Sequence, residues 1–200
     1  MKKIVAIAAA GVLALCLAGC GDGAQQGGET ASNGASDSAG WQADEPTDPF
    51  DIAMKNITES NLPNLDPSSE EGKQQIRDYL SSDAMQYRNS IFEFINMSLD
   101  AAADMDTDKA QDAEEYGSIL CEKVINQKDI PVSCSGVHIA NVTMAKNAEE
   151  AIAAYSHAAK TDDQTEANRL IAEGNAAVKK YTAATETFQA EVEKLNSYIQ

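Results

Sequence analysis

Cysteines have the widest chemical repertoire in this chain, because a thiol can be oxidised, acylated or bound to a metal. Two of the four, Cys121 and Cys134, flank a loop around Pro131. A disulfide between them would close a loop of about fifteen residues, which in the chain-entropy model stabilises a fold by roughly 3 kcal/mol. The alternative is two free thiols, with Cys121 packed beside Leu120 and Val124. No Cys-x-x-Cys spacing is present, so we expect no redox-active pair.

A second candidate for chemistry is the acidic segment 104–115. Its carboxylates have the spacing of positions 1, 3, 5, 9 and 12 in a calcium-binding EF-hand loop. They are Asp104, Asp106, Asp108, Asp112 and Glu115. Lys109 stands where the sharp turn requires glycine, and Gln111 where an aliphatic residue is usual. We therefore expect no metal here and favour an acidic turn whose Asp108 and Asp112 suit the positive end of a following helix. Calcium binding is kept as an alternative.

The histidines and the remaining possible nucleophiles form no recognisable metal or catalytic motif. His138 and His157 lack partners at the spacing of a helical metal site, and we expect both to be surface or boundary residues. The chain has no Gly-x-Ser-x-Gly, Walker or dinucleotide-binding motif. Its tyrosines fall mostly on or beside the inward stripes described below, where packing is their default role. The sequence therefore predicts no catalytic residues, no cofactor and no enzyme.

The first twenty residues follow a pattern of their own. Lys2 and Lys3 are followed by an apolar stretch, 4–17, interrupted by Gly11. This stretch is shorter than the roughly twenty residues that span a bilayer, and it has the size of a signal-peptide core. It closes with Leu17, Ala18, Gly19 and Cys20.

This terminus resembles that of bacterial lipoproteins, because Leu-Ala-Gly-Cys matches their lipobox at every position. The resemblance covers residues 1–20 only. It implies cleavage after Gly19, a diacylglyceryl thioether on Cys20, and often an acyl group such as palmitate on the new amino terminus. Two or more acyl chains hold stably to a membrane. The implied location is the outer face of the bacterial cytoplasmic membrane, or the outer membrane where there is one. Disulfides persist there, which favours the Cys121–Cys134 bond.

Residues 20–48 predict a flexible tether. The segment is rich in Gly, Ser, Gln and acidic residues, and no Lys or Arg occurs between Lys3 and Lys55. Such a chain has a root-mean-square reach of roughly 30 Å, and its negative charge gives it no electrostatic attraction to acidic headgroups. Trp41 is its one large aromatic residue, and we expect it to pack onto the body or to stay in a loop, with a partner-binding anchor as the alternative.

Residues 49–200 predict an all-α domain, because apolar residues recur at steps of three and four. A capping box of Ser68 and Glu71 begins a long first helix. Its inward stripe is Ile76, Leu80, Ala84, Tyr87, Ile91, Phe94, Ser98, Ala102 and Met105. A second helix is expected over about 108–127. A third covers 138–160, although 137–142 also reads as a strand.

A last helix follows a second capping box, Thr161 with Gln164. Its coiled-coil-like seam is Ile171, Gly174, Val178, Tyr181, Thr185, Phe188, Val192, Leu195 and Ile199. Short connections then predict an up-down antiparallel bundle of about four helices. The first and last helices should be about 50–55 Å long, which leaves one end uncovered. We expect a short helix within 50–65 to pack across that end.

Composition limits the function classes. The chain carries 15 basic and 32 acidic side chains, a net charge of −17 that argues against nucleic acid as a partner. Hydrophobic residues make up 43%, which excludes a fully disordered chain. We expect a monomeric, membrane-anchored module, attached through the lipid on Cys20, that presents an acidic helical surface to an envelope or host protein. The alternatives are a solute- or divalent-cation-binding lipoprotein and, less favoured, an enzyme.

Overall fold

The computed structural model describes residues 48–200. The lipobox, Cys20 and Trp41 lie outside the described residues. Within them the structure contains helices and no strand, which confirms the all-α prediction. The strand considered for 137–142 is wrong, because those residues lie inside a helix. The elements are α1 (Pro49–Thr58), α2 (Glu70–Leu80), α3 (Asp83–Asp104), α4 (Thr107–Ile125), the 3-10 turn η1 (Val132–Cys134), α5 (Ser135–Lys160) and α6 (Gln164–Ile199).

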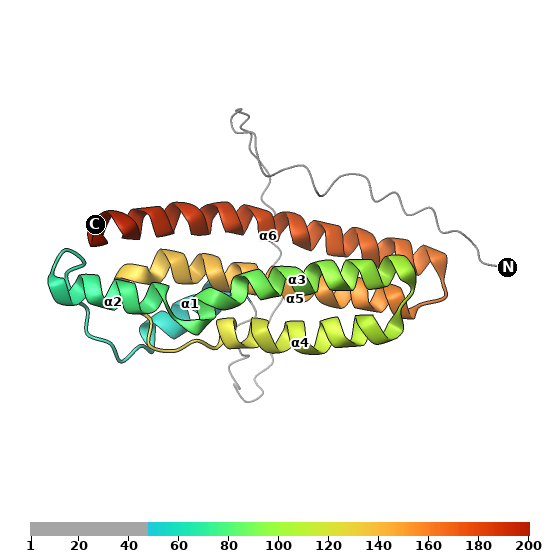
Figure 1. The fold of residues 1–200 in the computed structure, drawn as a ribbon, viewed down its shortest axis with the longest axis horizontal. Coiled ribbons are helices and arrows are strands. Elements are labelled where there is room, and N and C mark those ends of the chain that lie inside the picture. Colours follow the sequence, from blue (N-terminus) through green and yellow to red (C-terminus); the bar gives the residue numbers. More distant parts are fainter. Residues whose placement is uncertain (1–47) are drawn as a thin grey trace, which may run out of the picture. The chain divides into compact units, whose positions relative to one another are not determined.

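The four long helices α3, α4, α5 and α6 run alternately up and down the bundle, as short connections require (Figure 1). α5 is the central element and packs against α1, α3, α4 and α6. α3 also packs on α4, whereas α6 lies mainly on α5 and touches α2 near its own C-terminus. None of the helices in residues 48–200 is both long and apolar enough to cross a membrane.

The long first helix predicted from residue 68 to residue 105 is wrong, because it breaks at two serines. At the end of α2 the Arg77 carbonyl accepts from both the Ser81 amide at 3.0 Å and the Ser81 hydroxyl at 2.9 Å. Ser82 is extended, with φ −64° and ψ 155°, and precedes the first turn of α3. As a result α3 has 22 residues, about 33 Å, while α6 has 36, about 54 Å.

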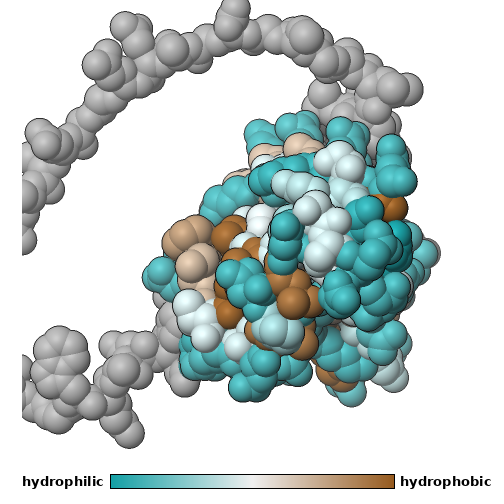
Figure 2. All heavy atoms as spheres, turned by 90° about the vertical axis from the view of Figure 1, so that its left-hand side faces the viewer, coloured by the Kyte–Doolittle hydropathy of each residue, from teal (hydrophilic) through white to brown (hydrophobic). Residues whose placement is uncertain are grey.

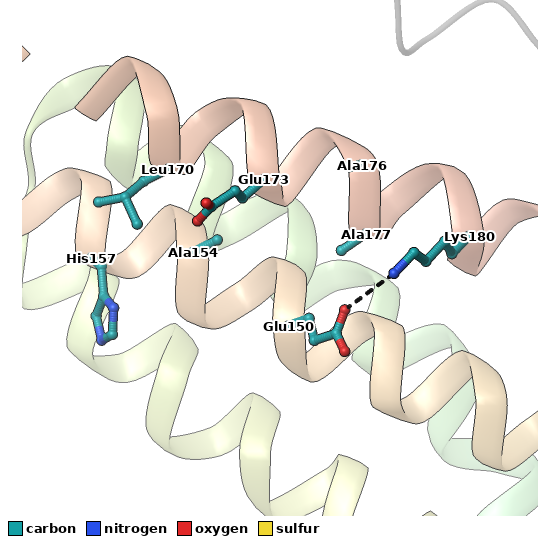
Figure 3. A pocket seen from close by; sticks show the side chains of 8 residues that line it. All are labelled: Glu150, Ala154, His157, Leu170, Glu173, Ala176, Ala177 and Lys180. Atoms are coloured by element: carbon teal, nitrogen blue, oxygen red, sulfur yellow. Dashed lines mark ion pairs between the residues drawn. The ribbon is translucent and has the colours of Figure 1, made fainter. Parts of the chain in front are cut away.

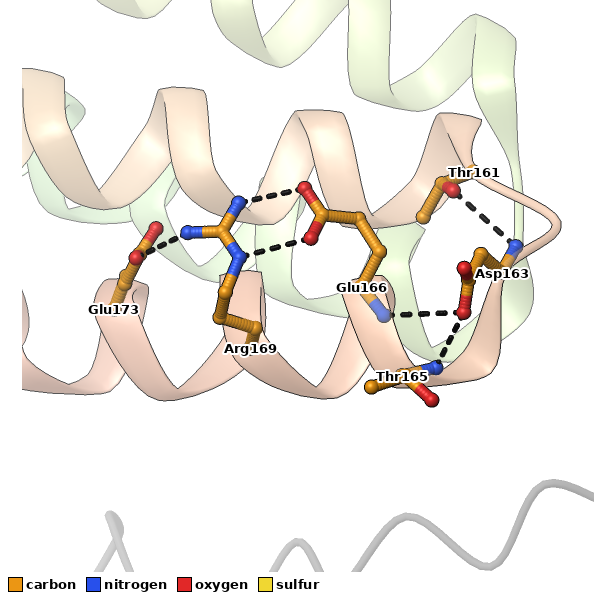
Figure 4. A network of polar contacts seen from close by, with 6 residues as sticks. All are labelled: Thr161, Asp163, Thr165, Glu166, Arg169 and Glu173. Atoms are coloured by element: carbon orange, nitrogen blue, oxygen red, sulfur yellow. Dashed lines mark hydrogen bonds and ion pairs between the residues drawn. The ribbon is translucent and has the colours of Figure 1, made fainter.

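Helix starts lie close to the predicted positions, but the capping residues differ. Ser69, not Ser68, caps α2 by accepting a hydrogen bond from the Gly72 amide at 3.0 Å. Asp163 caps α6 by accepting from the Thr165 and Glu166 amides at 2.8 and 3.3 Å (Figure 4). A tight turn at Thr161 separates α5 from α6, and the Thr161 hydroxyl accepts a hydrogen bond from the Asp163 amide at 3.2 Å.

The predicted short N-terminal helix is present as α1. Asp48 caps it by accepting from the Phe50 amide at 2.8 Å, and Pro49 occupies the first turn, where its missing N–H does no harm. Ala53, Asn56 and Ile57 are its buried residues. α1 packs along α5 instead of across the end of a long helix pair. The end-cap position expected for it is therefore wrong.

The inward stripe of α6 is wider than a coiled-coil seam. Five predicted seam residues are buried: Gly174, Val178, Tyr181, Phe188 and Leu195. The other four, Ile171, Thr185, Val192 and Ile199, are only partly buried, and Leu170, Ala177 and Ala184 complete the buried face. A broad face rich in small residues lets α6 lie close to α5, and the last residues of α6 continue past the start of α5 to α2. The heptads therefore serve the core of this chain.

Candidate functional site

Cys121 and Cys134 are both fully buried and free, so the predicted disulfide is not formed in this structure. The register of two antiparallel helices explains this. The Ser156 hydroxyl donates to the Ala110 carbonyl at 3.0 Å, which places Cys121 level with residue 145 of α5. Cys134, at the start of α5, is then about 16 Å away along the axis, whereas bridged cysteines need Cα atoms within about 7 Å.

Burial raises the pKa of Cys121 to about 12 and that of Cys134 to about 11, so both thiols stay protonated and unreactive. We predict that the mature protein, treated with a thiol reagent without reductant, reacts slowly when native. It should give two thiols per chain once unfolded, since Cys20 is expected to be a thioether. Zero thiols after unfolding would show a Cys121–Cys134 bond and contradict the structure.

The acidic segment 104–115 is a helix–turn–helix connection. Met105 adopts a left-handed conformation, φ 53°, and Asp106 caps α4 by accepting from the Lys109 amide at 3.0 Å. Residues 107–115 are helical, whereas an EF-hand loop wraps its ligands around one ion without a helix there. Among the described residues, no group of three His, Cys, Asp or Glu side chains could hold a metal ion. The geometry favours the acidic turn over calcium binding.

His138 is completely buried, so the expectation of a surface or boundary residue is wrong for it. The same expectation is confirmed for His157, whose side chain is exposed and whose Nε2 lies 3.6 Å from the Glu114 Oε1. The Nδ1 atom of His138 lies 3.2 Å from the Tyr79 hydroxyl, and its Nε2 lies 3.4 Å from the Asn56 Nδ2. Asn56 also donates to the Ile125 carbonyl at 2.6 Å. We call Asn56, Tyr79, His138 and the Ile125 carbonyl the His138 cluster.

The His138 cluster has no access to substrate. Burial lowers the pKa of His138 to about 4 and raises that of Tyr79 well above 10, so both are neutral at physiological pH. The nearby thiol of Cys134 is protonated for the same reason. A catalytic base and nucleophile need reach to a substrate and pKa values near the working pH. This arrangement joins helices and does not support catalysis.

A groove of about 460 Å³ lies open to solvent between α5 and α6 (Figure 3). Its lining is Glu150, Ala154, His157, Leu170, Glu173, Ala176, Ala177 and Lys180. Lys180 pairs across it with Glu150 at 3.9 Å, and Glu173 pairs with Arg169. The charged rim groups bond to protein partners, and none of the lining residues is aromatic except His157. The groove therefore gives little support to the solute-binding alternative.

The start of α6 carries a ladder of exposed ion pairs. Arg169 bonds to Glu166 on one side and to Glu173 on the other, and these contacts lower the pKa of Glu166 (Figure 4). Exposed pairs of this kind contribute little to stability and are screened by salt. We assign them to helix stabilisation and solubility.

The surface feature that the sequence failed to identify lies on α3 and α4. Tyr116, expected to pack in the core, is 53% exposed and stacks on Phe94 with ring centroids 6.4 Å apart. Ile119, one turn further along α4, is 43% exposed. We call Phe94, Tyr116 and Ile119 the α3–α4 aromatic face. Gly117 lets α4 lie close to both neighbouring helices, because a Cβ there would lie 2.7 Å from the Ile152 Cδ1 and 3.2 Å from the Phe94 Cβ.

Acidic residues outnumber basic ones beside the α3–α4 aromatic face, where the exposed Lys123 also lies, with its Nζ 5.2 Å from the centre of the Tyr87 ring. Asp112 precedes Tyr116 by one helical turn, and Glu115 and Glu122 lie one turn either side of Ile119. All three are exposed. Residues 48–200 as a whole carry 27 carboxylates against 13 Lys and Arg side chains. The end view in Figure 2 shows a mainly hydrophilic surface with a group of apolar side chains near its middle. Exposed aromatic rings elsewhere on this body are Phe50 and Phe92, the latter stacked on the buried Tyr181.

Comparison of the chain with protein-family models, with curated proteins and with solved structures found no match.

Proposed function

We propose that this chain is a bacterial lipoprotein, anchored outside the cytosol through Cys20, whose helical body binds another protein through the α3–α4 aromatic face. The anchor rests on the lipobox sequence Leu17–Cys20 and the apolar stretch before it. The acidic, glycine-rich segment 20–48 gives the body a reach of roughly 30 Å from the bilayer. The observation that carries the binding role is the exposed Tyr116, stacked on the half-buried Phe94 and next to the exposed Ile119.

Aromatic side chains on a surface are favourable binding anchors, because they bury a large area and lose little rotamer entropy. Tyr116 stacks on a half-buried Phe94 that α3 already holds in place. The face is therefore preorganised, which lowers the entropy lost on binding. Ile119 extends the apolar area along α4, in the geometry that a partner helix or extended segment would cover.

Charge selects the kind of partner. Asp112, Glu115 and Glu122 border the face, and a second copy of this acidic body would bring like charges together. An anionic lipid surface would be repelled for the same reason. A protein segment with apolar residues on one side and Lys or Arg on its borders is complementary to both features. We therefore assign a basic amphipathic segment of an envelope or host protein as the partner.

A pair of synthetic helical peptides tests this surface, one of leucine and lysine and one of leucine and glutamate. We expect the lysine peptide to bind and the glutamate peptide not to bind. The double replacement Tyr116→Ser and Ile119→Ser should lower the affinity for the lysine peptide by roughly tenfold or more, as loss of an interface hot spot does. Phe50→Ser, at a side chain 53% exposed on α1, is the matched control and should bind like the parent. Equal affinity of the double variant and the parent would refute the assignment.

A further inference from the structure

We propose that the His138 cluster is a pH-sensitive latch, which holds α1 on α5 at neutral pH and releases it when the surroundings become acidic. The proposal goes beyond the binding role and does not depend on it. α1 is the helix that directly follows the segment 20–48 in the chain. Release of α1 would therefore lengthen the connection between the anchor and the rest of the body.

The hydrogen bonds of the cluster specify which nitrogen of His138 is protonated. The Asn56 Nδ2 lies 2.6 Å from the Ile125 carbonyl, so the amide nitrogen and not the amide oxygen must face that acceptor. The same nitrogen then presents its second hydrogen to the His138 Nε2, which must accept. Nδ1 therefore carries the proton and donates to the Tyr79 hydroxyl at 3.2 Å.

A second proton on His138 would break this arrangement. It would add an N–H at Nε2, directly opposite the N–H of Asn56, so that two donors face each other. The resulting cation would also be fully buried. Burial accordingly lowers the pKa of His138 to about 4. Moving α1 away would remove Asn56 and let water reach the ring, which would restore a pKa near 6.5.

The groups around the ring offer no compensating charge. The titratable groups that face it are the Tyr79 phenol from α2 and the Cys134 thiol from η1, both neutral. α1 and α4 present the Asn56 amide and the Ile125 carbonyl. From α6, Glu191 lies over Gly136 and pairs with Lys194 at 3.5 Å.

Charged side chains beyond the ring are engaged on the surface. Near the end of α1, Glu59 pairs with Lys128 at 3.6 Å. On α2, Arg77 donates to the Ile199 carbonyl at 3.3 Å, and Asp78 accepts from Gln74 at 2.7 Å. Lys55, on α1, lies beside Asn56 in the sequence. His138 is the titratable group of the latch whose charge changes between pH 4 and pH 6.5.

The direction of the effect follows from the two pKa values. Above about pH 6.5, His138 is neutral whether α1 is closed or open, so pH has no influence. Between pH 6.5 and about 4, the open form takes up a proton that the closed form refuses, so opening becomes more favourable as the pH falls. The opening equilibrium should rise about 30-fold between pH 7.5 and pH 5.

Amide hydrogen exchange of the detergent-solubilised full-length protein tests the latch, with rates corrected for the intrinsic effect of pH. After this correction, the amide exchange rates in α1 should be about 30-fold higher at pH 5 than at pH 7.5. Exchange in α4 should stay unchanged. His157→Gln, at the exposed histidine, is the control and should behave like the parent. Equal acceleration in all helices, or none in α1, would overturn the proposal.

Two variants separate the latch from a merely structural role. His138→Gln cannot titrate and should abolish the pH dependence of α1 exchange. Asn56→Asp places a carboxylate against Nε2, which should raise the pKa of His138 and weaken or reverse the pH dependence. If His138→Gln fails to fold, Asn56→Asp decides alone. Persistence of the parent's acid response in Asn56→Asp would contradict the latch.

Discussion

Replacing Gly174→Ala should destabilise the body by about 2–3 kcal/mol, the upper part of the range of about 1–3 kcal/mol for overpacking a well-filled core. A Cβ at residue 174 would lie 2.7 Å from the Tyr155 Cδ1 and 2.8 Å from its Cζ. The Tyr155 ring is only 1% exposed and cannot swing away easily, because its hydroxyl donates to the Asn175 Oδ1 at 2.8 Å. The higher helix propensity of alanine offsets at most about 1 kcal/mol.

Urea denaturation of the Gly174→Ala variant measures this effect, with the Gly136→Ala variant as a matched control. Gly136 lies in the first turn of α5, and a Cβ there would meet only the flexible Glu191 side chain. Gly136→Ala should therefore change the free energy of unfolding by less than about 1 kcal/mol. Equal stability of the two variants would mean that α5 and α6 do not pack through Tyr155 and Gly174.

Helix class, turn positions and most inward stripes could be predicted because they follow from local periodicity. In the predicted first helix, for example, Ile76, Ala84, Ile91, Ser98 and Ala102 are all buried. The sequence before α3 does contain a local signal for a new helix, but the apolar periodicity favours one continuous helix there. Ser81-Ser82-Asp83 is a typical helix start, with serine at the N-cap and an acidic residue in the first turn. The apolar spacing continues across the break, which concealed it.

The polar interior could not be predicted, since it depends on residues that are distant in the sequence. His138 is buried because Asn56 and Tyr79, 82 and 59 positions away, meet its two nitrogens. The predicted Cys121–Cys134 disulfide is wrong for a related reason. Loop length permits a bond between Cys121 and Cys134, but the register of α4 against α5 sets their separation, and the sequence does not reveal that register.

The candidate docking face was also beyond prediction from periodicity. Tyr116 lies next to Gly117, a buried residue of α4, so the helical spacing alone predicts that Tyr116 packs inward. Gly117 instead lets α4 lie so close to α3 and α5 that the Phe94 ring reaches Tyr116 at the surface. Exposure of an aromatic pair results from interhelical distance, which a single sequence does not specify.

Replacing Cys20→Ser should abolish acylation completely, because the diacylglyceryl group requires a thioether sulfur that serine lacks. Cells grown with an alkyne-tagged palmitate should label the parent chain and leave Cys20→Ser unlabelled. Cys16→Ser is the matched control, since the expected cleavage after Gly19 discards residue 16. It should be labelled like the parent. Label retained by Cys20→Ser, or lost from Cys16→Ser, would place the acyl group elsewhere.

The intact mass of the detergent-extracted protein tests the anchor most directly. The account predicts a chain that starts at Cys20 and exceeds its peptide mass by a diacylglyceryl group, with or without an additional amide-linked acyl chain. Detergent should be needed for its extraction, as stable anchoring by two or more acyl chains requires. A mass that still includes Met1, or an unmodified Cys20, would contradict the account.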